Sequence, residues 1–204
     1  MPQYLDYEPF GGALELFNSL SPEILIHGPA GTGKSRGELE QVLMLADMFP
    51  RSRQLILRKT RVSLTESSLV TFEELVLAPN DPSRHGATRA HRTKYVRPNG
   101  AEIVVCGMDD PTRLFSTEYD IAYCNECNEL TEGEWESIHR ALRNGKLPWQ
   151  QLVGDCNPDA PTHWANQRCL RGKALRISTR HADNPALTQT YLNNLSTKLS
   201  GVRR

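Results

Sequence analysis

The stretch Ile24-Leu25-Ile26-His27-Gly28-Pro29-Ala30-Gly31-Thr32-Gly33-Lys34-Ser35 decides the fold of this chain. Its last eight residues match the pattern G-x-x-x-x-G-K-S. They follow a short apolar run and precede a helical pattern, which is the context that a phosphate-binding P-loop requires. The alternative is a glycine-rich turn between a strand and a helix. Because every fixed position is filled in the required context, we favour the P-loop.

Each fixed position of this loop has a chemical task. The glycines let the backbone curl so that successive N–H groups point at phosphate oxygens, and the helix that follows presents its positive end to the same anion. Lys34 reaches the β- and γ-phosphates, and the Ser35 hydroxyl is a ligand for Mg²⁺. The predicted cofactors are a nucleoside triphosphate and Mg²⁺. The predicted nucleotide-binding residues are Gly28, Pro29, Ala30, Gly31, Thr32, Gly33, Lys34 and Ser35.

Length and composition place limits on the chain. Its 204 residues suit one domain, and 38% hydrophobic residues suffice for a core. The 24 acidic residues balance the 24 Lys and Arg residues, so bulk charge does not argue for nucleic acid and only local patches can. Five cysteines without an apolar signal segment favour a reducing, intracellular compartment. No apolar run approaches the ~20 residues that span a membrane, so no membrane partner is expected.

Hydrophobic periodicity predicts an α/β fold. Helices are expected from the P-loop to about Phe49, at 64–77, at 131–142 and from Asp183 to about Leu199. Asn99-Gly100 predicts a β-hairpin insertion between 94–96 and 102–105. These elements predict a doubly wound, mostly parallel sheet with helices on both faces, whose strands carry the site at their carboxyl ends. The other short apolar runs, expected to be strands, are 24–27, 54–58, 120–124, 151–156 and 174–179.

Two polar residues follow predicted strands at that edge. Glu126 follows the run 120–124, where a carboxylate can orient and deprotonate an attacking water, and Glu129 is the second choice for this role. Asn157 follows the run 151–156. Cys124 and Cys127 form a C-x-x-C pair, but no second Cys or His pair follows at zinc spacing, so a metal role is disfavoured.

Residues 84–97 are strongly basic and contain no acid. Such a block in a neutral protein is a candidate contact for a nucleic-acid backbone, and a solvated basic face is an equally good interpretation. The residues predicted to bind DNA are Arg84, Arg89, Arg92 and Lys94.

The order of motifs is more specific than any one of them. The P-loop is followed by Ile56-Leu57-Arg58-Lys59-Thr60, then by Tyr119 to Leu130 with its Asn125-Glu126-Cys127-Asn128-Glu129-Leu130 series. Gly154-Asp155-Cys156-Asn157-Pro158, His163-Trp164 and Asp183-Asn184-Pro185 come next. Together they resemble the ATPase domain of the large terminase subunit, the motor that packages DNA in tailed bacteriophages. The resemblance covers about residues 7 to 200.

This resemblance implies a P-loop NTPase of the ASCE type that hydrolyses ATP to translocate double-stranded DNA into a procapsid. It implies catalytic roles for Glu126 and Lys34, and a coupling role for Asn157, which would sense the γ-phosphate. The implied partners are double-stranded DNA, a portal protein, a small terminase subunit and further copies of the chain in a ring, all in the host cytoplasm. The family also has a nuclease domain. We expect 1–204 to be the motor domain, with 1–22 as an N-terminal arm, and to lack nuclease activity.

The chain departs from the family pattern in three places. Asn125 stands where the family has an aspartate, so Mg²⁺ would depend on Ser35, phosphate oxygens and water, with help from Glu126. The P-loop has no arginine, so a transition-state arginine must come from elsewhere, such as a neighbouring subunit. Arg113 is the first candidate and Arg58 the second, and a surface salt bridge is the alternative role for Arg113. No adenine-binding glutamine precedes the P-loop.

Two other functions stay open at the level of sequence. A small P-loop kinase would use the 84–97 block as an arginine-rich lid over a phosphate acceptor. A non-catalytic assembly switch would bind ATP and turn over negligibly. Double-stranded DNA should stimulate hydrolysis by a translocase only.

Overall fold

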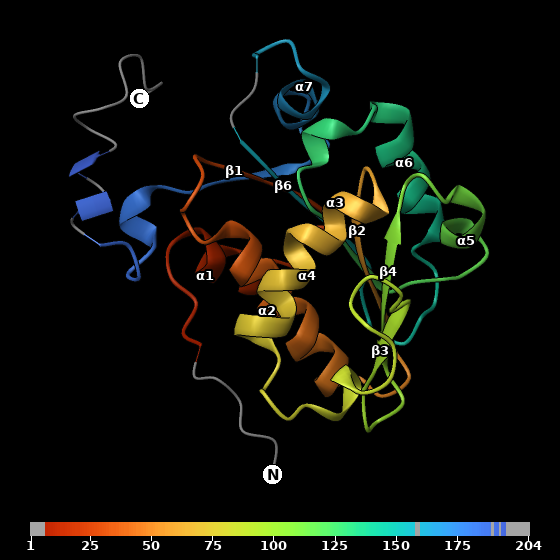
Figure 1. Cartoon of the computed structure of the whole chain (residues 1–204). Coiled ribbons are helices and arrows are strands. Elements are labelled where there is room, and N and C mark those ends of the chain that lie inside the picture. The colour runs from red at the N-terminus through yellow and green to blue at the C-terminus, as the bar shows by residue number, and fades with distance from the viewer. Residues whose placement is uncertain (1–6, 158–159, 189, 192, 195–204) are drawn as a thin grey trace.

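The computed structural model describes residues 7–157, 160–188, 190–191 and 193–194. These residues form a seven-stranded sheet with the order β3-β4-β2-β5-β6-β1-β7 (Figure 1). All neighbouring strands are parallel except β3 and β4, the antiparallel hairpin that Asn99-Gly100 predicted. The strands are β1 (Glu23–His27), β2 (Arg53–Arg58), β3 (Lys94–Val96), β4 (Glu102–Gly107), β5 (Ile121–Cys124), β6 (Gln151–Cys156) and β7 (Leu175–Ser178).

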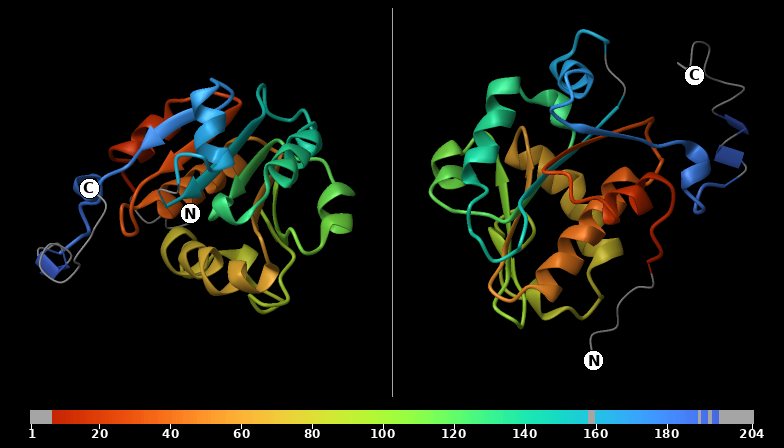
Figure 2. Two further views of the ribbon diagram at one scale, coloured as in Figure 1. Left: turned by 90° about the horizontal axis from the view of Figure 1, so that it is seen from above. Right: turned by 180° about the vertical axis from the view of Figure 1, so that it is seen from behind.

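Helices cover both faces of this sheet (Figure 2). One face packs against α1 (Gly12–Phe17), α2 (Lys34–Met48) and α4 (Ser68–Thr71), through Ile24 and Ile56 among others. The other face, which includes Leu25 and Leu55, packs against α5 (Pro111–Phe115), α6 (Glu132–Ala141) and α7 (Trp164–Leu170). Because both faces are covered, every residue of β1, β5 and β6 is buried. The predicted doubly wound α/β fold is confirmed.

The helix predicted over 64–77 is divided in three. It consists of α3 (Arg61–Glu66), α4 and the π-helix η1 (Phe72–Val76), and the backbone leaves the helical region at Ser67 with φ −118° and ψ −92°. The Ser67 hydroxyl donates to the Ser63 carbonyl oxygen at 2.6 Å and accepts from Arg58 Nη1 at 3.0 Å. Side-chain hydrogen bonds of this kind compete with the helical ladder.

The helix predicted to begin after Asp183 does not begin there. Asp183 instead ends a 3₁₀ turn, η4 (His181–Asp183), and residues 184–188 are not helical. Residues 190–191 and 193–194 are helical, while the remainder of the predicted helix, 189, 192 and 195–199, lies outside the described residues. The Asn184 Nδ2 donates to the Gly31 carbonyl oxygen of the P-loop at 2.7 Å, while its Oδ1 accepts from the Ala186 N–H at 3.1 Å in a turn that residues 187 and 188 do not continue as a helix.

The other short elements complete the chain. The sequence Thr131-x-x-Glu134 forms the capping box that starts α6. The 3₁₀ turns η2 (Pro82–Arg84) and η3 (Cys127–Glu129) lie in connections. Of the expected N-terminal arm, residues 1–6 lie outside the described part, and α1 packs against α2 and β7. Among the described residues, no helix is long and apolar enough to cross a membrane.

A buried ion-pair network fastens β1 to the helices of the second face. The Glu23 carboxylate accepts hydrogen bonds from Trp135 Nε1 at 2.9 Å, from His139 Nε2 at 2.9 Å and from the Arg168 guanidinium. Burial by itself would raise the pKa of Glu23, but the hydrogen bonds from His139, Arg168 and Trp135 outweigh it and lower the pKa to about 2. The charged form of Glu23 therefore stabilises the fold.

This network predicts a pH dependence of stability. The pKa of Glu23 falls from its ordinary 4.5 to about 2 on folding, so its contribution is complete above pH 4.5 and is lost as the pH falls toward 2. In Glu23→Gln the unfolding free energy should therefore vary less over this window than in the wild type. Urea unfolding at a series of pH values measures the difference.

The matched control is Glu118→Gln, which removes an exposed carboxylate paired with Arg143. Exposed pairs contribute little, so this variant should follow the wild-type pH profile. Parallel pH profiles for Glu23→Gln and the wild type would contradict the prediction.

Candidate active site

The P-loop lies at the carboxyl end of β1 and leads directly into α2. Gly31 and Gly33 have φ of 82° and 86°, a left-handed conformation that glycine adopts without strain and other residues rarely adopt. The Lys34 ammonium folds back over the loop and donates to the carbonyl oxygens of Gly28 at 2.8 Å and Pro29 at 3.0 Å. The loop therefore has the turn, the helix N-terminus and the cation that the sequence predicted.

The segment that follows β7 forms hydrogen bonds with the P-loop and with the end of β1. Thr179 Oγ1 lies 2.8 Å from Thr32 Oγ1 and donates to the His27 carbonyl oxygen at 3.2 Å. Asn184 Nδ2 donates to the Gly31 carbonyl oxygen at 2.7 Å, and His181 Nε2 lies 3.1 Å from the Ala30 carbonyl oxygen. These hydrogen bonds hold the loop conformation from side chains 151 and 153 positions further along the chain, and Asn184 also lines the cavity at the loop.

A buried carboxylate that sequence reasoning missed lies beside the loop. Asp155, near the end of β6, is 1% exposed, and its Oδ2 accepts a hydrogen bond from the Ser35 hydroxyl at 2.7 Å. Its Oδ1 accepts from the backbone N–H of Glu126 at 2.8 Å and from Asn125 Nδ2 at 3.2 Å. This one side chain therefore connects α2, β6 and the residues that follow β5.

Glu126 has an unusual backbone conformation for a residue with a side chain. Its φ of 50° and ψ of 53° lie in the left-handed region, where non-glycine residues are uncommon. The hydrogen bond from its N–H to Asp155 helps to hold this turn. Burial raises the pKa of Glu126 and the Asp155 charge raises it further, whereas Arg58 and Lys34 lower it, with a net increase. A raised pKa suits a general base near neutral pH.

Other charges surround these two carboxyl groups. Glu129, the second choice for the base, is bound by Arg58, whose Nε and Nη2 donate to its carboxylate at 3.0 and 2.6 Å. Glu38, on α2, is 1% exposed, and burial raises its pKa well above the ordinary value, with Asp155 contributing. Glu126 is therefore better placed for the chemistry than Glu129.

One cavity of about 310 Å³ brings most of the predicted P-loop residues together with Glu126 and Asn157. Backbone N–H groups at a helix N-terminus, an ammonium, a hydroxyl and carboxylates are the groups that bind phosphates and Mg²⁺, so its lining fits a nucleotide and its metal. The lining includes residues 30–36, Glu126, Asp155 and Asn157.

A second cavity of about 440 Å³ adjoins the first and shares Thr32, Gly33 and Lys34 with it. Tyr7 and Phe10 line it from the N-terminal segment, and the Tyr7 ring lies under the Arg36 guanidinium, 5.3 Å from its centre. A mostly apolar cavity with aromatic walls next to a phosphate site suits a nucleobase.

The two candidate arginines lie in different places. Arg58, at the end of β2, is close enough to Glu126 to lower its pKa. Arg113 lies on α5, which follows β4, and β4 is four strand positions from β1, about 19 Å across the sheet at ~4.8 Å per strand. Arg113 therefore does not reach the P-loop of its own chain.

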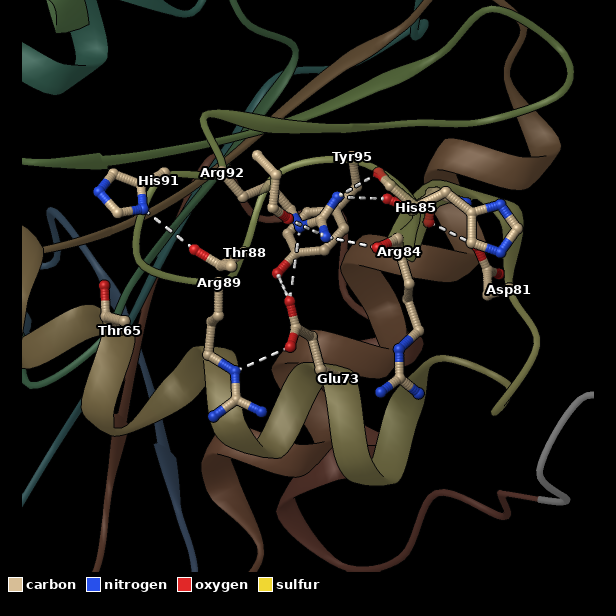
Figure 3. Close-up of polar contacts among 12 residues, drawn as sticks. Thr65, Glu73, Asp81, Arg84, His85, Thr88, Arg89, His91, Arg92 and Tyr95 are labelled. Atoms are coloured by element: carbon tan, nitrogen blue, oxygen red, sulfur yellow. Dashed lines mark hydrogen bonds and ion pairs between the residues drawn. The ribbon is translucent and has the colours of Figure 1, made fainter.

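The basic block is mostly neutralised (Figure 3). Arg92 is 7% exposed, and its guanidinium donates to the carbonyl oxygens of Ser83 at 2.8 Å and His85 at 3.1 Å, among others. Arg92, one of the residues predicted to bind DNA, is thus a buried side chain that holds its own loop, and we do not retain it as a candidate DNA contact. Arg89 pairs with Glu73 and Lys94 with Glu102. Arg84 has no ion pair within the described part of the chain.

The signal for Asp155 is present in the sequence but weak. Asp155 precedes Cys156 and Asn157 near the end of an apolar run, and this pattern predicts the strand but does not single out the Asp155 carboxylate. Only the position of β6 between β1 and β5 places it against Ser35. β6 lies between β1, which leads into the P-loop, and β5, which is followed by the predicted catalytic acid Glu126.

Comparisons with known proteins agree with this geometry. A family model described as phage terminase large subunit matches residues 23–201. No curated protein sequence matches the chain. The fold is similar to the large terminase of the thermophilic bacteriophage D6E (TM-score 0.75, 16% identity, 96% of this chain and 52% of that chain). A D6E complex with ATP-gamma-S gives a TM-score of 0.70 at 16% identity, with 95% and 50% covered.

A third solved structure contains an ATPase domain alone. The large terminase ATPase domain of Thermus phage P74-26 has a TM-score of 0.64 at 14% identity, covering 94% of this chain and 89% of that chain. The chain thus spans about half the length of the D6E large terminase and most of the P74-26 domain. The P-loop NTPase fold predicted from sequence is confirmed.

The hydrogen bonds from the segment after β7 to the P-loop predict that a residue outside the loop affects nucleotide affinity. Asn184→Ala removes the hydrogen bond to the Gly31 carbonyl, worth about 1 kcal/mol, and should weaken binding of ATPγS by roughly 5-fold. Isothermal titration calorimetry measures the dissociation constant. Asn18→Ala removes a similar exposed amide-to-carbonyl bond, to Leu14, and should leave the affinity unchanged. Equal affinities for both variants would show that the Asn184–Gly31 hydrogen bond does not contribute to nucleotide binding.

Proposed function

We propose, on the premise that this chain belongs to the phage terminase large subunit family, that it is an ATPase motor domain that drives double-stranded DNA into a procapsid. The observation that carries the proposal is the single cavity in which the P-loop, Glu126 and Asn157 meet. A P-loop alone is shared by kinases and switches. A carboxylate on a neighbouring strand, facing the same cavity, is what hydrolysis requires.

The residues of the cavity divide the work of hydrolysis. The N–H groups of residues 30–35 and the Lys34 ammonium bind the phosphates and balance charge that develops on the γ-phosphate. To do so, Lys34 exchanges its hydrogen bonds to the loop carbonyls for bonds to phosphate oxygens. Ser35 is the loop residue that would hold Mg²⁺, which, when bound, neutralises phosphate charge.

Glu126 is the residue that activates water. Glu126 lines the cavity, and burial together with the Asp155 charge raises its pKa, which strengthens its carboxylate as a base. Glu126 adopts a left-handed turn and lines the same cavity as the P-loop. Asn157, which is exposed in the same cavity, is placed to sense the γ-phosphate and to transmit hydrolysis to the segment that follows β6.

A transition-state arginine is supplied by a second copy of the chain. Arg113 lies too far across the sheet to act on its own P-loop, so as a finger it requires a ring in which α5 of one copy faces the cavity of the next. Arg58 is the alternative within one chain, although its guanidinium is engaged by Glu129. The second cavity, with Tyr7 and Phe10, receives the base.

The remaining partners follow from the family. Double-stranded DNA, a portal protein and a small terminase subunit are proposed partners, and the host cytoplasm is the proposed location. We propose that residues 1–204 are the motor domain, with 1–22 as its N-terminal arm. Of the basic block, we retain Arg84, Arg89 and Lys94 as candidate DNA contacts, of which Arg84 is the one whose charge no described acid balances.

The first experiment measures steady-state ATP hydrolysis across a wide range of protein concentration. Specific activity should rise with concentration, because assembly supplies the finger, and Glu126→Ala should reduce the rate roughly 10²- to 10⁴-fold. Mixing Glu126→Ala with Arg113→Ala should restore activity, since one interface of the mixed ring then has both groups. Double-stranded DNA should stimulate the assembled wild type.

The outcomes separate the alternatives. Activity that is independent of concentration, with no rescue in the mixture, would mean that the site is complete in one chain and would favour Arg58. Activity that DNA leaves unchanged would favour a kinase, and negligible turnover under all conditions would favour an assembly switch.

The basic block makes a separate prediction about DNA. Arg84→Ala should weaken binding of a double-stranded DNA fragment and reduce the slope of log affinity against log salt by about 1, because one phosphate contact is lost. Fluorescence anisotropy at several salt concentrations measures both. Arg53→Ala, which removes an arginine paired with Glu102, is the matched control and should change neither. An unchanged slope for Arg84→Ala would place the DNA contact elsewhere.

A further inference from the structure

The carboxylate beside the P-loop serine comes from an unexpected strand. P-loop NTPases hold Mg²⁺ with the loop Ser or Thr and with an aspartate at the end of a neighbouring strand. In this chain β5 is followed by Asn125-Glu126 and offers no aspartate there. We propose that Asp155, on β6, is the carboxylate that orients the Mg²⁺ of a bound nucleotide, with Asn125 as its hydrogen-bond donor. The inference rests on the proposed function, since it concerns the same site.

The sheet register explains how the carboxylate can come from β6. Cys124 pairs with Gly154, so the next residues, Asn125 and Asp155, are neighbours on adjacent parallel strands. Both side chains lie on the α2 face, where the Ser35 hydroxyl meets Asp155 at 2.7 Å. Strands are ~4.8 Å apart, so placing the acid on β6 and the amide on β5 moves the carboxylate by one strand only. Ser35 remains within reach of it.

The hydrogen bonds of Asp155 leave its charge without a cation. Its donors are a hydroxyl (Ser35), an amide side chain (Asn125) and a backbone N–H (Glu126), all of them neutral. Within the described part of the chain, no Lys, Arg or His forms an ion pair with Asp155. A carboxylate that is 1% exposed without a cationic partner is costly, and a divalent cation at Ser35 would supply the missing charge.

The position of Asp155 explains why residue 125 is an asparagine and not an aspartate. Asn125 Nδ2 lies 3.2 and 3.4 Å from the two carboxylate oxygens of Asp155. An aspartate at both positions would place two negative charges at this distance, and each would disfavour the other. Asn125 also accepts from Ser67 at 3.3 Å and donates to the Tyr123 hydroxyl at 3.1 Å, so its amide is oriented by its neighbours. Asn125 and Asp155 together therefore place one carboxylate, held by an oriented amide donor, beside Ser35.

The test measures how strongly Mg²⁺ tightens nucleotide binding. The full chain is titrated with ATPγS by calorimetry, once with Mg²⁺ and once with EDTA, and the ratio of the two dissociation constants is compared between variants. Asp155→Asn should reduce this ratio roughly 10- to 100-fold, the usual cost of removing a group that supports a metal site. Its affinity in EDTA should be retained, because the P-loop is intact. The double exchange Asn125→Asp/Asp155→Asn should recover most of the wild-type ratio.

A control variant and two contrary results distinguish failure of this inference from failure of the ATPase proposal. Glu118→Gln, which removes one negative charge from an exposed pair, should keep the wild-type ratio. An Asp155→Asn chain with a wild-type ratio would overturn the inference and leave the ATPase proposal intact. A wild type that binds no ATPγS would overturn both. Circular dichroism checks folding, and if Asp155→Asn does not fold, the double exchange decides: a folded variant without metal dependence contradicts the inference.

Discussion

The hydrogen bond between the Ser35 hydroxyl and the Asp155 carboxylate joins the parts of the molecule that the site depends on. Ser35 lies in the first turn of α2, Asp155 is the second-last residue of β6, and the same carboxylate accepts from the backbone N–H of Glu126 after β5. Parallel strands make this convergence possible, because they all end at one edge of the sheet. The carboxylate is buried, so its donors must be well placed, and the positions of three elements become mutually dependent. The left-handed turn at Glu126 is stabilised by that arrangement rather than by its own sequence.

Charge pairing decides which basic residues are available at the surface. The segment 84–97 has no acid of its own, yet the fold brings Glu73, Glu74, Asp81 and Asp47 to it from elements before it. The pairs formed by Arg97 are largely buried, and Arg92 holds the carbonyls of its loop. A basic run in sequence is therefore mainly a structural device here. Its net effect on a nucleic acid is smaller than its composition indicates.

The predicted helix after Asp183 and the unbroken helix over 64–77 failed for the same reason. In both, a small polar side chain forms a tertiary hydrogen bond in addition to a local one. Asn184 bonds to the Gly31 carbonyl, and Ser67 bonds to Arg58 and Ser63. The local signals, an Asp followed by Asn-Pro and a run of apolar residues at helical spacing, are real but weak. Contacts to partners far away in sequence outweigh them, and periodicity cannot detect such partners.

The sequence by itself determined the α/β class, the strands, the hairpin, the P-loop and the candidate acid at Glu126. These follow from local patterns: glycines that permit a left-handed turn, apolar runs that must be buried, and a carboxylate directly after a strand. Tertiary structure alone decided the order of the strands. That order set Asp155 against Ser35, Arg113 far across the sheet from the P-loop, and Asn184 against the Gly31 carbonyl of the loop. Such pairings depend on which strands become neighbours, and strand order follows from packing over the whole core rather than from any one stretch of the chain.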